Sequence, residues 1–490
     1  MIMAEPAVAA GLPDELGPVD YLLHRGEANP RTRSGIMALE LLDSTPDWER
    51  FRTRFENASR KVLRLRQKVV APTLPTASPR WVVDPDFNLD FHVRRVRVPE
   101  PGTLRAVFDL AELILQSPLD ISRPLWTATL VEGLPDGKAA TLLHVSHAVT
   151  DGVGGVEMFA EIYDLERDPP ARPTPPLPVP QDLSPNDLMR EGINRLPIAV
   201  VGGALNALTG AVSVAGRALL EPMSTVSGIV GYAVSGMRVL NRAAEPSPVL
   251  RRRSLATRSE AIDIPLADLH KAAKAGGGSI NDAYLAGLCG ALRRYHEALG
   301  VPIGTLPMAV PVSLRADADT AGGNRFTGVN LAAPIGTADP VARMKKIRAQ
   351  MTQRRDEPAM NIIGSLAPVL SVLPTTVLEG ITGSVVGSDV QASNVPVYPG
   401  DTYIAGAKVL RQYGIGPLPG VAMMVVLISR GGWCTITVRY DRAAVRNEAL
   451  FAHCLLEGFD EILALAGDPP PRAVPASFTE PTTSKRTAGS

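Results

Sequence analysis

The stretch HVSHAVTDG, residues 144–152, decides how the rest of the sequence is interpreted. The run 138–147 has the pattern of a buried strand, in which successive side chains point to opposite faces. His144 and Ser146 are therefore expected on one face, with His147 on the other. The Asp-Gly that follows indicates a tight turn, so we predict His147 at the end of a strand, where loops commonly carry chemistry.

The pair His144 and His147 has a spacing that also occurs in metal sites. On a strand, however, the two rings leave opposite faces of the sheet, so we expect no shared metal ion. A histidine within a strand is more often a core residue bonded to a backbone carbonyl. An imidazole placed before a tight glycine turn favours a different role for His147, that of a general base.

Several other short motifs accompany this stretch in a fixed order. Together the set resembles the bacterial wax ester synthase/diacylglycerol acyltransferase family of the coenzyme A-dependent acyltransferase superfamily. Each motif alone has a high false-positive rate, but an ordered set spanning roughly 300 residues is specific. The motifs are His147-x-x-x-Asp151-Gly152, residues 86–94, Pro124-Leu125-Trp126, Asn281-Asp282, residues 311–315, Gly323-Asn324 and Ser393-Asn394-Val395-Pro396.

The resemblance implies an α/β fold of two chloramphenicol acetyltransferase-like domains, each a mixed β-sheet flanked by helices, with the active site at the domain interface. It implies that His147 takes a proton from an acceptor hydroxyl as that oxygen attacks the thioester of a long-chain acyl-CoA. Asp151, paired with an arginine, and Gly152 would form the scaffold of the site. The resemblance further implies acyl-CoA as a co-substrate, and no cofactor or metal is expected. The acceptor that it implies is diacylglycerol, giving triacylglycerol, with a long-chain alcohol, giving a wax ester, as the close alternative.

Two positions depart from the family's usual pattern. Ser146 stands where the first of two adjacent histidines is usual, and we expect it to support the site rather than to carry the proton. Its effect on rate and acceptor preference is left open. Val397-Tyr398 follows Pro396 where a glycine is usual, which predicts a differently shaped loop.

Four residues of the second half are candidates for supporting the site: Asn281, Asp282, Ser393 and Asn394. For Asp282 a structural explanation is favoured, because Ser279 three positions earlier predicts a capping box at a helix start. For Asn281 a role at the site and a structural role are equally well supported. Trp126 is expected to be a core residue.

Composition restricts the class of protein. The chain has 490 residues, 45% of them apolar, which indicates more than one folded domain. Its 50 basic and 50 acidic residues give no net charge, which argues against nucleic-acid binding. Three widely spaced cysteines without a Cys-x-x-Cys motif, and an N-terminus without a secretory signal pattern, indicate the cytoplasm.

Proline-rich segments divide the chain. We predict an N-terminal domain over 1–185, an interdomain linker with apolar helices over 186–259, a C-terminal domain over 260–467 and a disordered tail over 468–490. Strands are expected within the C-terminal domain at 308–313, 423–428 and 435–440.

Residues 197–216 contain no charged side chain. Their length suits a transmembrane helix, but their many small residues favour interdomain packing or an interfacial membrane helix instead. Peripheral contact with a membrane or lipid droplet is therefore expected. A second apolar region, 358–388, is explained equally well by core helices or by an acyl-chain channel.

Other chemistries lack their motifs, since neither a Gly-x-Ser-x-Gly elbow nor a Walker A loop occurs. Two alternatives stay open. The same histidine motif serves acyltransferases that use carrier-protein thioesters, including condensation domains. A catalytically weak lipid-binding protein is the alternative from another class.

Overall fold

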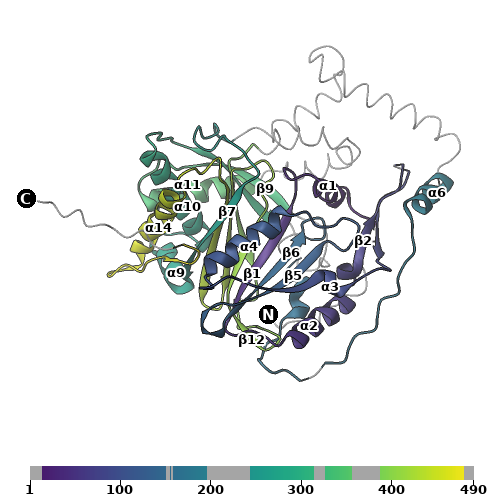
Figure 1. The fold of residues 1–490 in the computed structure, drawn as a ribbon. Helices are drawn as coiled ribbons and strands as arrows, with labels where there is room; N and C mark the ends of the chain where they lie inside the picture. Colours follow the sequence, from purple (N-terminus) through teal and green to yellow (C-terminus); the bar gives the residue numbers. More distant parts are fainter. Residues whose placement is uncertain are drawn as a thin grey trace, which may run out of the picture.

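The computed structural model describes residues 14–74, 76–150, 155, 158–170, 172–195, 243–313, 326–355 and 387–478. In these ranges the chain forms two halves, each built on a large β-sheet with helices packed against it (Figure 1). The two-domain α/β architecture expected from the sequence is thereby confirmed. The domain boundaries near 185, 259 and 467 stay predictions.

The first sheet has six strands, and β6, the strand that ends just before the predicted base His147, lies inside it. Only the β4–β5 pair is parallel; the other neighbours are antiparallel. Across the sheet the strands are β11 (Tyr403–Ile404), β12 (Ala407–Ile415), β1 (Gly35–Leu42), β6 (Ala139–Ser146), β5 (Trp126–Glu132) and β4 (Val93–Arg97).

Alternation along β6 follows the prediction. Leu143 and Val145 belong to a core cluster with Trp126, whereas Ala140 and Leu142 belong to a second cluster on the opposite face. Helix α2 (Trp48–Lys61) contributes to the first cluster and helix α4 (Leu104–Gln116) to the second. Both faces of the strand are covered, which explains why apolar residues occur on both of them.

Strand β12 differs from expectation. Its position in the sequence lies in the predicted C-terminal domain, yet it pairs antiparallel with β1, from Met37 opposite Ile415 to Leu42 opposite Val409. Figure 1 shows the yellow-green β12 beside the purple β1. An alternating pattern predicts which face of a strand is buried but not which strand it joins.

The second sheet has seven strands, and helices α9 (Leu266–Ala275), α10 (Ile280–Ala298), α11 (Pro340–Arg355) and α14 (Glu448–Leu463) cover its outer face (Figure 1). The three strands predicted in this half are confirmed as β8, β13 and β14. In sheet order the strands are β15 (Val474–Pro475), β7 (Thr257–Pro265), β14 (Trp433–Asp441), β13 (Met423–Arg430), β10 (Val390–Pro396), β8 (Leu306–Ser313) and β9 (Phe326–Ala333).

Helices α10 and α14 cross at glycines. A Cβ atom on Gly458 would lie 2.4 Å from the backbone nitrogen of Ala291, and one on Gly287 would lie 2.7 Å from the ring of Phe459. The close approach of the two helices therefore requires the absence of side chains at both positions. This contact forms part of the core of the second half.

Smaller elements complete the described chain. They are helices α1 (Pro18–Gly26), α3 (Leu89–His92) and α6 (Pro185–Arg195), the 3₁₀ segments η1 (Leu63–Arg66), η2 (Pro135–Gly137), η3 (Phe159–Ile162) and η4 (Ala464–Ala466), and a two-stranded sheet of β2 (Gln67–Val70) and β3 (Arg80–Val83).

The segment predicted as a disordered tail, 468–490, includes residues that pack against the second sheet. Val474–Pro475 forms β15 against β7, and the Ser477 hydroxyl donates to Oε2 of Glu260 at 2.6 Å while accepting from the backbone nitrogen of Ala261 at 2.8 Å. The prediction is therefore wrong for these residues. Proline is compatible with a short strand at a sheet edge, so a proline-rich composition does not exclude one.

Several sequence predictions lie outside the described residues. They concern residues 197–216, nearly all of 358–388, Asp151, Gly152, residues 314–315 and Gly323-Asn324. Across the described ranges, no helix combines the length and apolar character that crossing a bilayer requires.

Candidate active site

His147 begins the turn that follows β6. Its backbone nitrogen donates to the carbonyl oxygen of Ser34 at 3.3 Å, and Val149 closes the turn by donating to the carbonyl of Ser146 at 3.0 Å. The His147 side chain is half-buried, whereas its neighbours Ser146 and Ala148 are buried. The predicted position of His147, at the end of a buried strand, is therefore confirmed.

Ser146 points to a buried carboxylate. Its hydroxyl donates to Oε1 of Glu27 at 2.7 Å and accepts from the backbone nitrogen of Ala148 at 3.2 Å. The Ser34 hydroxyl donates to the same Glu27 oxygen at 2.9 Å, and the Ser34 backbone nitrogen does so at 3.3 Å. Burial raises the pKa of the Glu27 carboxyl, while the bonds from Ser146 and Ser34 and the charge of Arg33 oppose that shift.

His144 lies two residues earlier on β6, on the same face as Ser146. Gly35 provides the space for its ring, because a Cβ atom there would lie 2.5 Å from Nε2 of His144. Burial, together with the positive charges of Arg439 and Arg33, lowers the pKa of His144 to about 3. The imidazole is therefore neutral near pH 7, and it is enclosed in the protein rather than placed in a turn.

Three more histidines are core residues. Burial lowers the pKa of His92 and of His24 to about 4, and that of His296 in the same direction. His92 Nδ1 lies 2.7 Å from the carbonyl of Trp126, and His296 Nδ1 lies 2.7 Å from that of Leu292. His270 and His453 lie on helices α9 and α14. Among the seven histidines, only His147 lies in a turn that ends a strand.

The candidates in the second half lie on two separate elements. Ser279 and Asp282 form the capping box that the sequence predicted, with the Asp282 carboxylate accepting from the Ser279 backbone nitrogen at 2.8 Å. Asn281 is half-buried at the same helix start. Ser393 and Asn394 lie on β10, paired with β13. In the described part of the chain, none of these four side chains bonds to the His147 turn, so their role at the site stays a prediction.

Charged side chains of the second sheet reach the first half close to this region. Nη2 of Arg439 on β14 lies 3.2 Å from Oε2 of Glu112 on α4, and Nη1 of Arg105 on α4 lies 3.0 Å from Oε2 of Glu260 on β7. Arg439 also contributes to the pKa shift of His144. The interface between the halves thus comes near the face of β6 that carries His144 and Ser146.

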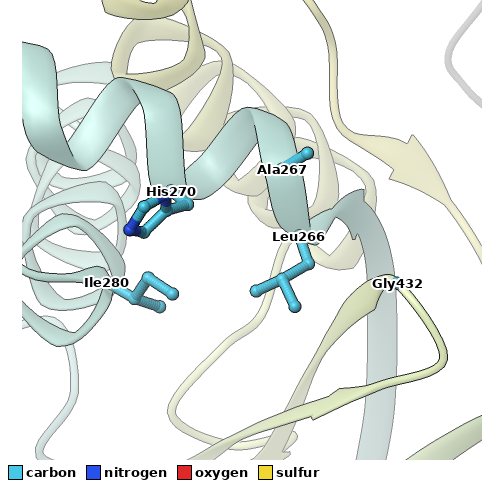
Figure 2. Close-up of a pocket in the computed structure, with 5 residues that line it drawn as sticks. All are labelled: Leu266, Ala267, His270, Ile280 and Gly432. Atoms are coloured by element: carbon cyan, nitrogen blue, oxygen red, sulfur yellow. The ribbon is translucent and has the colours of Figure 1, made fainter. Parts of the chain in front are cut away.

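The cavity in Figure 2 lies elsewhere, at the outer helices of the second half. Its volume is about 380 Å³. It contains none of the residues predicted for the site, and we do not assign it to the active site. Its lining residues are Leu266, Ala267, His270, Ile280 and Gly432.

Glu27, Ser34 and Gly35 were not found from the sequence. They gather around the His147 turn because β1 pairs antiparallel with β6, with Gly35 opposite Ser146. The available signal was the polar run 24–34 just before the apolar run of β1. The polar run indicates a site only once the pairing of β1 with β6 is known, and local sequence patterns do not predict that pairing.

Comparison with known proteins gives consistent results. Residues 11–284 match the model of the wax ester synthase/diacylglycerol acyltransferase catalytic domain, and residues 322–463 match that of the WS/DGAT C-terminal domain. A Mycobacterium tuberculosis protein named as a diacylglycerol O-acyltransferase is 86% identical over 97% of this chain and 97% of its own length.

Solved structures agree in fold. The wax ester synthase/diacylglycerol acyltransferase from Marinobacter aquaeolei VT8 is 19% identical, with a TM-score of 0.62 over 92% of this chain and all of that one. The first condensation domain of the CDA synthetase is 14% identical, with a TM-score of 0.52 over 94% of this chain and 99% of that one. At these identities the likeness concerns the fold alone.

Proposed function

The chain belongs to the wax ester synthase/diacylglycerol acyltransferase family, and we propose that it transfers a long-chain acyl group from acyl-CoA to diacylglycerol, forming triacylglycerol. The observation that carries this proposal is the 86% identity, over nearly the whole chain, to a protein named as a diacylglycerol O-acyltransferase. A long-chain alcohol is the second candidate acceptor, because the matching family model covers wax ester synthases as well.

In the proposed reaction both substrates are bound together and no acyl-enzyme forms. The neutral imidazole of His147 takes the proton of the acceptor hydroxyl as that oxygen forms a bond to the thioester carbonyl carbon. The carbon–sulfur bond then breaks, and the CoA thiolate takes the proton back from the imidazolium. General base catalysis of this kind contributes roughly 10²- to 10⁴-fold, and positioning of the two substrates contributes further.

The geometry of the turn supports His147 in this role. It is half-buried at the end of β6, whereas the other histidine of the motif, His144, is buried within the strand with a lowered pKa. Asp151 and Gly152 are proposed to hold the loop, with Asp151 paired to an arginine. Asn281, Asp282, Ser393 and Asn394 are proposed as support from the second half.

Diacylglycerol barely leaves a bilayer, so the enzyme must reach a lipid surface to bind it. We therefore propose a cytoplasmic protein that attaches peripherally to membranes or lipid droplets. The uncharged segment 197–216 is the proposed contact.

One experiment separates the candidate functions. Purified protein is incubated with labelled palmitoyl-CoA and, separately, with dioleoylglycerol or hexadecanol, and a parallel reaction supplies palmitoyl-loaded acyl carrier protein instead. Labelled triacylglycerol is the expected product, at a higher rate than wax ester. Turnover only with the carrier-protein donor would contradict the use of acyl-CoA, and binding without turnover would identify a non-catalytic relative.

A further inference from the structure

Glu27 is a buried carboxylate at the centre of a small polar cluster. It lies at the C-terminal cap of α1, and its side chain is completely enclosed. One oxygen, Oε1, accepts three hydrogen bonds: from Ser146 Oγ at 2.7 Å, from Ser34 Oγ at 2.9 Å and from the Ser34 backbone nitrogen at 3.3 Å. A single atom therefore joins the segment before β1 to the last residue of β6.

Both partners of Glu27 are bonded to the backbone around His147. The Ser34 carbonyl accepts the His147 N–H at 3.3 Å, and Ser146 Oγ accepts the N–H of Ala148 at 3.2 Å. The histidine is thus bracketed: the residue before it is bonded to the carboxylate, while its own N–H and that of the residue after it are bonded to partners of the carboxylate. Displacement of Glu27 would release this turn at several points together.

Glu27 is itself firmly anchored. Its backbone nitrogen donates to the carbonyl of His24 at 3.3 Å, and its own carbonyl accepts from Nε of Arg33 at 3.2 Å. Arg33 extends the connection by donating through Nη1 to the carbonyl of Gln116 at 2.6 Å, at the end of α4. Glu27 therefore links the His147 turn to helices α1 and α4 of the first half.

The burial of the Glu27 carboxylate is not explained by the stability of the fold. Oε2 of Glu27 is buried, and no hydrogen bond from the described residues reaches it. A buried carboxylate with an unsatisfied oxygen lowers stability relative to an apolar residue of the same shape. Local features that lower the stability of a fold tend to occur at functional sites.

We propose that Glu27 is a positioning residue for the acyl-transfer reaction, which acts through Ser146 and Ser34 to hold the backbone that carries His147. This inference rests on the proposed function of His147 as general base. Glu27 does not exchange a proton with the substrate in this scheme. Its contribution is to keep the imidazole within the narrow range of positions that proton transfer tolerates.

The test compares kcat and KM in four variants under conditions where circular dichroism shows each to be folded. Glu27→Ala should lower kcat about 10- to 100-fold, with KM for palmitoyl-CoA within about 2-fold of the wild type. Glu27→Gln keeps an acceptor oxygen for Ser146 and Ser34, so it should retain kcat within about 5-fold. Ser146→Ala should give an intermediate loss, and Glu27→Ala/Ser146→Ala should lose no more than Glu27→Ala alone.

Glu40 provides a matched control. It is an equally buried carboxylate on β1, but its partners are Thr141, Tyr163 and Arg430, none of which bonds to the turn in the described ranges. Glu40→Ala should therefore lower the melting temperature without the loss of kcat. Equal losses of kcat in Glu40→Ala and Glu27→Ala, or strictly additive losses in the double variant, would overturn the positioning role.

His147→Ala, measured in parallel, distinguishes the positioning role of Glu27 from the assignment of His147 as general base. If His147→Ala is inactive while Glu27→Ala keeps the kcat of the wild type, the positioning role is wrong and the base assignment stands. If His147→Ala keeps the kcat of the wild type, the base assignment itself is wrong. Should Glu27→Ala fail to fold, the comparison of Ser146→Ala with the wild type and with His147→Ala decides the question.

Discussion

Arg439 of β14 and Glu112 of α4 form a buried ion pair between the two halves of the molecule, with Nη2 3.2 Å from Oε2. Thr257 and Ser259 also donate to the Glu112 carboxylate. We predict that Glu112→Ala lowers the free energy of unfolding by about 3–5 kcal/mol, because Arg439 keeps a buried charge without its partner. Urea titration followed by circular dichroism measures the change. Glu112→Met/Arg439→Leu should lose less than the single variant; a larger loss would contradict this explanation.

His147→Ala is predicted to lower kcat at least about 10²-fold with a melting temperature close to that of the wild type. The half-buried imidazole lies in a turn and contributes little to packing. The assay measures triacylglycerol formed at saturating palmitoyl-CoA and dioleoylglycerol. Near-normal turnover would show that His147 is not the base.

Asp151→Ala is predicted to behave differently from His147→Ala. If the carboxylate is paired with an arginine and holds the loop, its loss should lower the melting temperature together with activity. Thermal unfolding and the acyltransfer assay on the same preparations distinguish the two patterns. An Asp151→Ala protein that is as stable as the wild type but inactive would point to a direct catalytic role.

Stability should fall as the pH is lowered from about 6.5 to about 4. Burial is the main cause that lowers the pKa of His92 from 6.5 to about 4, so within this range the unfolded chain binds a proton that the folded protein excludes. The contribution is complete above pH 6.5, and His92 alone accounts for a loss of about 3 kcal/mol down to pH 4. His24 and His144 shift in the same direction.

Urea titrations of the wild type and His92→Gln at several pH values test this expectation. The variant should show a shallower decrease of the free energy of unfolding below pH 6.5. Phe87→Leu is the control, since Phe87 stacks on His92 with centroids 5.0 Å apart but carries no titratable group. It should lower stability while keeping the slope of the wild type; an unchanged slope in His92→Gln would contradict the assignment.

Gly458→Ala is predicted to destabilise the second half by about 1–3 kcal/mol, because the added methyl group would meet the backbone of Ala291 at the crossing of α10 and α14. Differential scanning calorimetry measures the effect. Gly304→Ala provides a comparison, since a Cβ atom there meets no atom within 4 Å. A Gly458→Ala protein as stable as Gly304→Ala would show that the two helices separate without loss.

Peripheral membrane attachment predicts that much of the protein sediments with membranes and is released by high salt or carbonate without detergent. Replacing Val200, Leu205 and Leu208 with serine should shift it to the supernatant and raise the apparent KM for diacylglycerol more than that for acyl-CoA. Retention after carbonate would indicate a spanning helix. Full activity of a wholly soluble wild type would assign segment 197–216 to interdomain packing.

The sequence predicted the local elements well where periodicity was strong. The strand that carries His144, the capping box of Ser279 and Asp282, and the three strands of the second half all occur where they were expected. Each depends on neighbouring residues of the chain, such as an alternation of apolar positions or a serine three positions before an aspartate. Such features are determined locally and are therefore visible in one sequence.

The surroundings of His147 could not be predicted in the same way. Glu27 is separated from Ser146 by 119 positions, and their contact arises from the pairing of β1 with β6. A buried glutamate among polar residues has no periodic pattern that distinguishes it from an exposed one. The ion pair between Arg439 and Glu112 could not be predicted from local patterns either, because the two residues come from opposite halves of the chain.

The place of β12 in the first sheet has a consequence for synthesis of the protein. Because β12 ends at Ile415, the ribosome must translate most of the chain before β1 receives its second neighbour. Until then β1 presents an open edge with unpaired backbone groups, which is a template for association with other nascent chains. The N-terminal half made alone should therefore aggregate, and coexpression with a fragment that contains β12 should restore its solubility.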